Sequence, residues 1–126
     1  MAARMRKKIL LVDDNKELLE LLSLSLQDAG FSIVTATDGL EALKKARSLL
    51  PDLILLDLML PGMDGFVVCE TLRKDPATAS LPVLMLSGMS GQLPKYAGLE
   101  SGGTDFISKP ASPASLIERI RQILPA

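Results

Sequence analysis

The sequence predicts an α/β protein with a five-stranded parallel sheet covered by helices on both faces. Short apolar runs alternate with helical patterns five times along the chain. Three runs are apolar at every position, as expected for strands buried on both faces of a parallel sheet. Right-handed crossovers would place helices on both sides of that sheet. The 126 residues, 48% of them hydrophobic, predict a single domain over 1–126.

The five apolar runs are the expected strands. The first, third and fourth are wholly apolar and belong inside the sheet, whereas the second and fifth are more polar or shorter and suit its edges. The predicted ranges are Ile9–Val12, Ile33–Ala36, Leu53–Leu56, Val83–Leu86 and Phe106–Ile107.

Five helices are expected around these strands. The first has leucines at helical spacing and ends at Gly30, and the second ends at Pro51. The fourth is weak because Gly98 falls inside it, so we expect this helix to be short or mobile. The predicted ranges are Lys16–Ala29, Leu40–Leu50, Gly65–Lys74, Pro94–Ser101 and Ser115–Leu124.

Composition excludes several classes of protein. The net charge is -1, so bulk electrostatics does not favour direct binding of nucleic acid, and the basic run from Arg4 to Lys8 is interpreted as a solvated lead-in. The only cysteine, Cys69, cannot form an internal disulfide and suits a buried thiol. There is no secretory signal and no apolar run of the roughly 20 residues that span a bilayer. We expect a cytoplasmic protein without membrane contact.

Polar residues follow four of the five expected strands. Asp13 and Asp14 follow the first, Asp57 the third, Ser87 the fourth and Lys109 the fifth. Ligands of open α/β sheets bind beyond the carboxyl ends of the strands, so these side chains can converge on one crevice.

This set of side chains indicates phosphoryl chemistry. Three close carboxylates repel one another unless a cation joins them, and oxygen donors without histidine favour Mg²⁺ over Zn²⁺. A carboxylate can itself accept a phosphoryl group as an acyl phosphate. An ammonium and a hydroxyl can neutralise charge on the moving oxygens. Asp57 is the hardest of these residues to explain as purely structural, because apolar residues flank it on both sides and carboxylates are rarely buried without a partner.

Each candidate also has a structural interpretation. Asp14 with Glu17 fits a capping box for the first helix. Ser87 before Gly88 fits turn chemistry, and Lys109 fits a solvated strand end. These alternatives stay open one by one, but their coincidence at the ends of four strands favours a site.

The chain resembles response-regulator receiver domains from about Lys8 to Leu124. The resemblance implies a doubly wound, flavodoxin-like fold with strand order 2-1-3-4-5, for which a chemotaxis receiver is a standard example. The matching segments are Ile9–Asn15, Asp57–Gly65, Leu86–Gly88 and Asp105–Pro110.

The resemblance also implies a metal-dependent acceptor. Asp57 would take a phosphoryl group from a sensor histidine kinase or a phosphotransfer protein. Asp14, Asp57 and the backbone carbonyl of Met59 would ligate Mg²⁺, and Asp13 would hold the ion through water. The domain would not be an enzyme, since it would promote only its own phosphorylation and dephosphorylation.

A switch is implied as well. Ser87 and Lys109 would contact phosphoryl oxygens, the Lys109–Pro110 peptide would be cis, and Phe106 would swing inward when Ser87 moves. An ordinary core role for Phe106 remains the alternative. The change would alter the surface of the fourth helix, fifth strand and fifth helix, which could also pair two copies. The output partner is not predicted.

The sequence also allows a comparison with three rival functions. A haloacid dehalogenase-type phosphatase would need an Asp-x-Asp pair after the first strand, where Asp13-Asp14-Asn15 stands. A flavodoxin-like cofactor binder would need a phosphate loop there, and carboxylates would repel phosphate. A degenerate receiver, acting as a phosphorylation-independent binding module, is the more serious alternative. The chain could be complete, or part of a longer regulator or hybrid histidine kinase.

Overall fold

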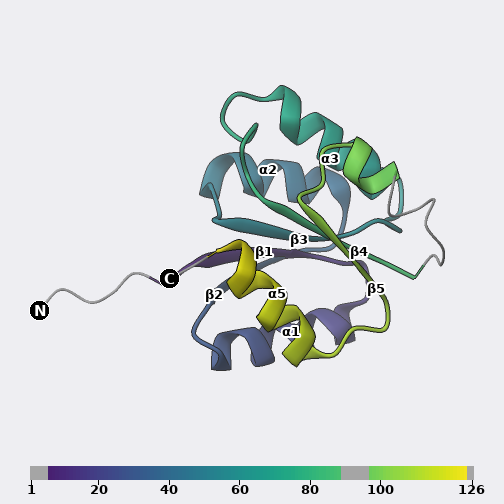
Figure 1. Ribbon diagram of the computed structural model, residues 1–126. Coiled ribbons are helices and arrows are strands. Elements are labelled where there is room, and N and C mark those ends of the chain that lie inside the picture. Colours follow the sequence, from purple (N-terminus) through teal and green to yellow (C-terminus); the bar gives the residue numbers. More distant parts are fainter. Residues whose placement is uncertain (1–5, 89–96, 125–126) are drawn as a thin grey trace, which may run out of the picture.

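The computed structural model has a central parallel sheet with helices on both faces, and it describes residues 6–88 and 97–124 (Figure 1). All four strand pairings are parallel and the strand order is β2-β1-β3-β4-β5, which confirms the predicted order and the two edge strands. The strands are β1 Lys8–Val12, β2 Ser32–Ala36, β3 Leu53–Asp57, β4 Val83–Ser87 and β5 Asp105–Ser108.

Four longer helices connect and cover the strands. α1 and α5 lie on one face of the sheet, and α2 and α3 lie on the other (Figure 1). They are α1 Lys16–Asp28, α2 Gly39–Leu49, α3 Gly65–Lys74 and α5 Pro113–Ile123. Helical residues 97–100 stand where the weak fourth helix was expected, and the first part of that prediction, residues 94–96, lies outside the described residues. No helix among the described residues is long and apolar enough to cross a membrane.

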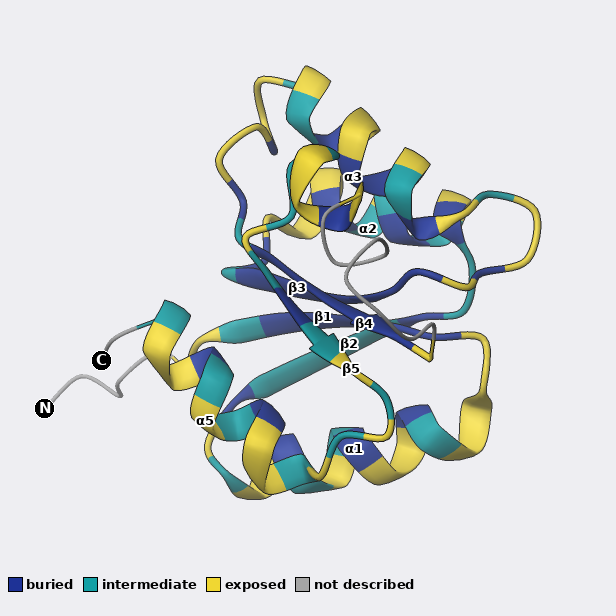
Figure 2. Ribbon diagram, turned by 45° about the vertical axis from the view of Figure 1, so that its right-hand side comes forward, coloured by how far each residue is buried: buried dark blue, intermediate teal, exposed yellow. Residues whose placement is uncertain are grey.

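Two apolar layers, one on each side of the sheet, form the core. Successive strand residues point to opposite faces, so Leu10 packs with the α2–α3 layer and Leu11 with the α1–α5 layer. Ile54 and Leu55 divide in the same way, and both are fully buried. This is why the central strands are apolar at every position, and Figure 2 shows them as the most buried part of the chain.

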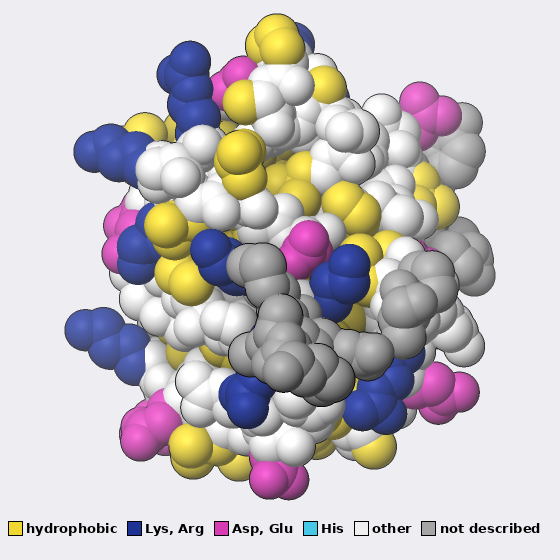
Figure 3. All heavy atoms as spheres, turned by 90° about the vertical axis from the view of Figure 1, so that its left-hand side faces the viewer, with side chains coloured by type: hydrophobic (Ala, Val, Ile, Leu, Met, Phe, Trp, Pro, Cys, Tyr) yellow, Lys and Arg dark blue, Asp and Glu magenta, His cyan; other side chains and the backbone are white. Residues whose placement is uncertain are grey.

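The surface carries no dominant sign of charge on the face seen in Figure 3. Lysine, arginine, aspartate and glutamate side chains are scattered there among hydrophobic ones. That distribution agrees with the net charge of -1.

The end of α2 differs from the expectation that it would run to Leu50. Leu50 is the C-cap with φ 45°, in the left-handed region, and its N–H donates to the carbonyl of Ala46 at 3.1 Å. A residue with a Cβ is disfavoured in the left-handed conformation. The Leu50 side chain is 59% exposed, so its hydrophobic burial contributes little stability to offset that cost.

Replacing Leu50 with glycine is therefore expected to stabilise the fold. Glycine removes the left-handed penalty, and we expect the free energy of unfolding to rise by about 1 kcal/mol, measured by urea denaturation. Leu49→Gly is the matched control, because Leu49 is the last helical residue and should lose up to about 1 kcal/mol there. A Leu50→Gly protein no more stable than the native chain would contradict this account.

Candidate functional site at the carboxyl edge of the sheet

Asp13 is held at the end of β1 by the backbone on both of its sides. Its N–H donates to the carbonyl of Ala36 at 3.1 Å, which carries the β1–β2 pairing one residue further. Its Oδ1 accepts the N–H of Asn15 at 2.9 Å, and the residue is 2% exposed. The carboxylate is therefore fixed and largely shielded from water.

The structural alternative for Asp14, a capping box at the first helix, is wrong. The helix begins at Lys16, so the cap is Asn15, whose Oδ1 accepts the N–H of Leu18 at 3.1 Å. Asparagine is as good an N-cap as aspartate, and the sequence pattern did not distinguish them. Asp14 is exposed beside Asp13, and its carboxylate is not used by the cap.

Asp57 is the last residue of β3 and is 3% exposed. Its Oδ1 accepts the N–H of Met59 at 3.1 Å, which places Met59 directly beside the carboxylate. Leu58 continues the sheet by donating to the carbonyl of Leu86 at 2.9 Å. The side chain is thus aimed by the strand and by the first turn of the loop that follows.

Gly65 supports this loop, a role that the sequence pattern did not predict. Its N–H donates to the carbonyl of Leu58 at 3.0 Å. A Cβ at Gly65 would lie 2.6 Å from the Cα of Leu58 and 2.8 Å from the carbonyl oxygen of Asp57, so only glycine fits. The available signal was a glycine opening a helix straight after the N-cap Asp64.

Lys109 joins two of the carboxylates. Its ammonium lies 2.9 Å from Oδ2 of Asp13 and 3.1 Å from Oδ2 of Asp57, which are 96 and 52 residues away in the chain. The side chain is 25% exposed, so it is not a solvated strand end. Its backbone N–H donates to the carbonyl of Ser87 at 2.7 Å, and the Lys109–Pro110 peptide bond is cis.

Burial and hydrogen bonding act in opposite directions on the pKa values of Asp57 and Lys109. Burial disfavours the ionised carboxylate and raises the pKa of Asp57, against the hydrogen bonds from Met59 and Lys109 that favour ionisation. Burial alone would lower the pKa of Lys109, but hydrogen bonds to Asp13 and Asp57 outweigh it, and the net shift is upward. The Lys109 ammonium is therefore charged. The ionised form of the Asp57 carboxylate is destabilised by its burial.

Three carboxylates meet at this edge. Asp13, Asp14 and Asp57 each offer an oxygen, and these oxygens all lie within 4.8 Å of one another. One ammonium cannot balance three carboxylates, and the donors are all oxygen. Such a group fits a hard divalent cation.

The two expected switch residues lie on neighbouring strands. Ser87 is the last residue of β4, is fully buried and pairs in register with Ser108, so it belongs to the strand and not to a turn. Phe106 is 7% exposed and lies in the same apolar cluster as Met85. The aromatic side chain is therefore inside in this structure.

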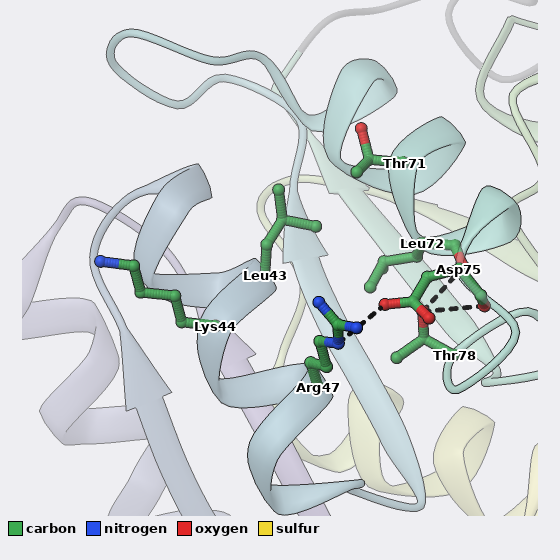
Figure 4. Close-up of a pocket in the computed structure, with 7 residues that line it drawn as sticks. All are labelled: Leu43, Lys44, Arg47, Thr71, Leu72, Asp75 and Thr78. Carbon is green, nitrogen blue, oxygen red and sulfur yellow. Dashed lines mark hydrogen bonds and ion pairs between the residues drawn. The ribbon is translucent and has the colours of Figure 1, made fainter.

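A separate pocket of about 220 Å³ lies between α2 and α3 (Figure 4). Arg47 and Asp75 form an ion pair of 3.4 Å at this pocket, and Arg47 is 74% exposed. Thr78 is buried there and donates to the carbonyl of Leu72 at 2.8 Å. None of the predicted site residues lines the pocket, so we assign it no part in the carboxylate site.

Comparison with known proteins finds a family model and relatives that are response regulators. The model of the response regulator receiver domain matches residues 9–121. The alkaline phosphatase synthesis transcriptional regulatory protein PhoP of Bacillus subtilis is 45% identical over 95% of this chain and 49% of its own length. The DNA-binding response regulator MtrA of Mycobacterium tuberculosis is 45% identical over 93% of this chain and 50% of its own length. The chain spans about half the length of these curated relatives.

Solved structures agree in fold. A chemotaxis response regulator of Vibrio cholerae has a TM-score of 0.90 and 34% identity, with 95% of this chain and 100% of that chain covered. A Francisella response regulator receiver domain has a TM-score of 0.88 and 32% identity, with 94% and 96% covered.

Proposed function

The chain belongs to the response regulator receiver domain family of two-component systems, and we propose that it accepts a phosphoryl group on Asp57 from a histidine kinase or phosphotransfer protein. The observation that carries this proposal is the buried Asp57 carboxylate, 3.1 Å from the Lys109 ammonium and grouped with two further carboxylates. A buried carboxylate with a cation beside it is suited to attack phosphorus and to tolerate the charge that accumulates there.

The transfer needs little from the protein beyond position and charge. An Asp57 oxygen would attack the phosphorus in line, the bond from phosphorus to the donor histidine nitrogen would break, and that nitrogen would keep the electron pair. The Lys109 ammonium and the Ser87 hydroxyl would each contact a phosphoryl oxygen. Later attack by water would release phosphate and restore Asp57. We propose that the domain catalyses only these two reactions of its own side chain.

The carboxylate group fits Mg²⁺ as the metal. Asp14, Asp57 and the backbone carbonyl of Met59 would hold the ion directly, and Asp13 would hold it through water. A bound Mg²⁺ offsets the negative charge of the carboxylates and of the phosphoryl oxygens. The support is the donor set itself, three close carboxylate oxygens at the end of the strands.

The proposal is tested by intact mass after incubation with acetyl phosphate and Mg²⁺. We expect a single phosphoryl adduct that does not form when EDTA removes the metal. If a folded protein that binds Mg²⁺ gives no adduct, the proposal is overturned and a phosphorylation-independent binding module is favoured.

Lys109→Gln is expected to change metal binding and phosphorylation in opposite directions. The ammonium lies within 3.1 Å of Asp13 and Asp57 and competes with any cation there, so Mg²⁺ should bind about tenfold more tightly in the variant. Adduct formation should slow at least about tenfold, because a phosphoryl oxygen loses its cation. Calorimetric titration measures the first effect and intact mass the second.

Lys74→Gln serves as the control for this pair of measurements. Lys74 is exposed at the end of α3 and should leave both values unchanged. Weaker Mg²⁺ binding by Lys109→Gln would argue against competition between the ammonium and the metal.

The signal from the phosphorylated site would reach a partner through the surface formed by residues 97–100, β5 and α5. We propose that phosphorylation changes this surface for a protein partner, or for pairing of two copies. Several relatives are DNA-binding regulators, and this chain spans about half of their length. In such a protein we place the DNA contact in the other half, since this chain has a net charge of -1. A cytoplasmic location and the absence of membrane contact stay predictions.

A further inference from the structure

The Arg73 side chain connects α3 to the loop before β5. Its Nε and Nη2 both donate to the carbonyl of Gly102, at 2.9 and 2.7 Å. Its Nη1 donates to the carbonyls of Leu81 at 2.6 Å and Ala79 at 3.2 Å. One guanidinium therefore ties the loop after α3 to Gly102, which lies 29 residues after Arg73 in the chain.

The Gly102 carbonyl can accept hydrogen bonds from Arg73 because of the turn that closes the helical residues 97–100. Gly102 has φ +106°, and its N–H donates to Leu99 while the N–H of Gly103 donates to Gly98, each at 3.0 Å. This pair of bonds is a Schellman ending, which closes the helical segment. A Cβ at Gly102 would lie 2.7 Å from the Cγ of Arg73, so the guanidinium stem fills the space beside the glycine.

The held segment covers the aromatic residue of β5. A Cβ at Gly98 would lie 2.7 Å from the sulfur of Met85 and 3.4 Å from the Phe106 ring. A Cβ at Gly103 would lie 2.6 Å from the same sulfur. The two glycines thus let the backbone close directly over Met85 and Phe106, and Phe106 is 7% exposed beneath it.

A buried phenyl ring has no polar atom that would gain a partner by moving out. Unlike tyrosine, phenylalanine forms no hydrogen bond with water, and exposing its ring costs the whole hydrophobic contribution of burial. Nothing in this arrangement requires a group on Asp57.

We propose that Arg73 is a positioning residue, which holds residues 97–103 over Phe106 so that the ring is already inside before phosphorylation. The inference rests on the proposed function only in taking Asp57 as the residue that is phosphorylated. Ser87 is then the part that responds to Asp57, and the aromatic part is preset by packing.

The test follows the Phe106 ring by nuclear Overhauser contacts to the labelled methyl of Met85. Spectra are taken of the protein free and with Mg²⁺ and fluoroberyllate, a stable mimic of the phosphoryl group. We expect the ring–methyl contact at equal strength in both states of the native protein. Its absence from the free protein, with appearance on adding the mimic, would overturn the inference.

Arg73→Gln separates positioning from simple stabilisation. We expect the ring–methyl contact of the free variant to fall at least about twofold and to recover with the mimic. Arg47→Gln is the control, since the Arg47 side chain is 74% exposed and pairs with Asp75, and its loss should leave the contact unchanged. A folded Arg73→Gln protein with a lower Tm but native contact strength would show that Arg73 only stabilises, and would overturn the inference.

A second variant and the spectrum of the free protein keep the test decisive. If Arg73→Gln does not fold, Arg73→Lys, which keeps the charge but loses the planar fork, is measured in the same way and judged by the same criterion. The free-protein spectrum needs no phosphorylation, so a chain that forms no adduct on Asp57 would refute the proposed function and still report where the ring lies.

Discussion

Replacing Asp57 with asparagine is expected to abolish the phosphoryl adduct formed with acetyl phosphate and Mg²⁺. An amide oxygen is a poor nucleophile, and the other two carboxylates of the group, Asp13 and Asp14, lie at the end of β1 and not at the end of β3. Asp28→Asn, on the exposed side of α1, is the control and should keep the adduct. Intact mass of both variants decides the matter, and an adduct on Asp57→Asn would move the acceptor to another residue.

The same substitution should stabilise the metal-free protein. Because burial raises the pKa of Asp57, ionising this group costs folding free energy. The stability that it contributes is complete below the pKa of an unfolded aspartate and is lost as the pH rises through the higher folded pKa. At neutral pH without metal, Asp57→Asn should therefore raise Tm, by a few degrees.

Two dependences check the electrostatic origin of that gain. The gain should shrink as the pH falls towards the pKa of an unfolded aspartate, because both proteins are then neutral at this position. It should also shrink or reverse when Mg²⁺ is added, since the native carboxylate would bind the ion. A gain in Tm that is independent of pH would show that packing, and not charge, is responsible.

Replacing Gly65 with alanine is the second change with a large expected effect. The new Cβ would meet the Cα of Leu58 at 2.6 Å and the carbonyl oxygen of Asp57 at 2.8 Å, and both are backbone atoms that cannot swing aside. We expect the free energy of unfolding to fall by about 1–3 kcal/mol, as for other overpacked sites. Adduct formation should slow as well, because the shift moves the end of β3.

Gly88→Ala is the matched control for this stability measurement. Apart from its neighbours in the chain, no atom of the described residues lies within 4 Å of a Cβ placed at Gly88, so the change should stay within about 0.5 kcal/mol by urea denaturation. Equal stability of Gly65→Ala and the native protein would mean that the loop after Asp57 relaxes freely, contrary to the packing described.

The strands were predictable from the sequence because burial on both faces leaves a simple local pattern. Leu53 to Leu56 is apolar at each position, and the structure divides these residues between the two layers of the core. Ends of elements were less predictable. Whether Asn15 or Asp14 caps α1 depends on one turn of backbone, and the left-handed conformation of Leu50 has no signature in its side chain.

The sequence alone determined the sheet, its edge strands and the set of polar residues at its carboxyl edge. Each of these features is a local pattern of residues that are adjacent in the chain. Only the tertiary structure decided which of these groups touch. Lys109 reaches Asp13 across 96 residues, and Arg73 reaches Gly102 across 29. Such contacts depend on how the helices and strands pack. Periodicity in the sequence shows which face of an element a side chain lies on, but it does not show which distant residue the side chain contacts.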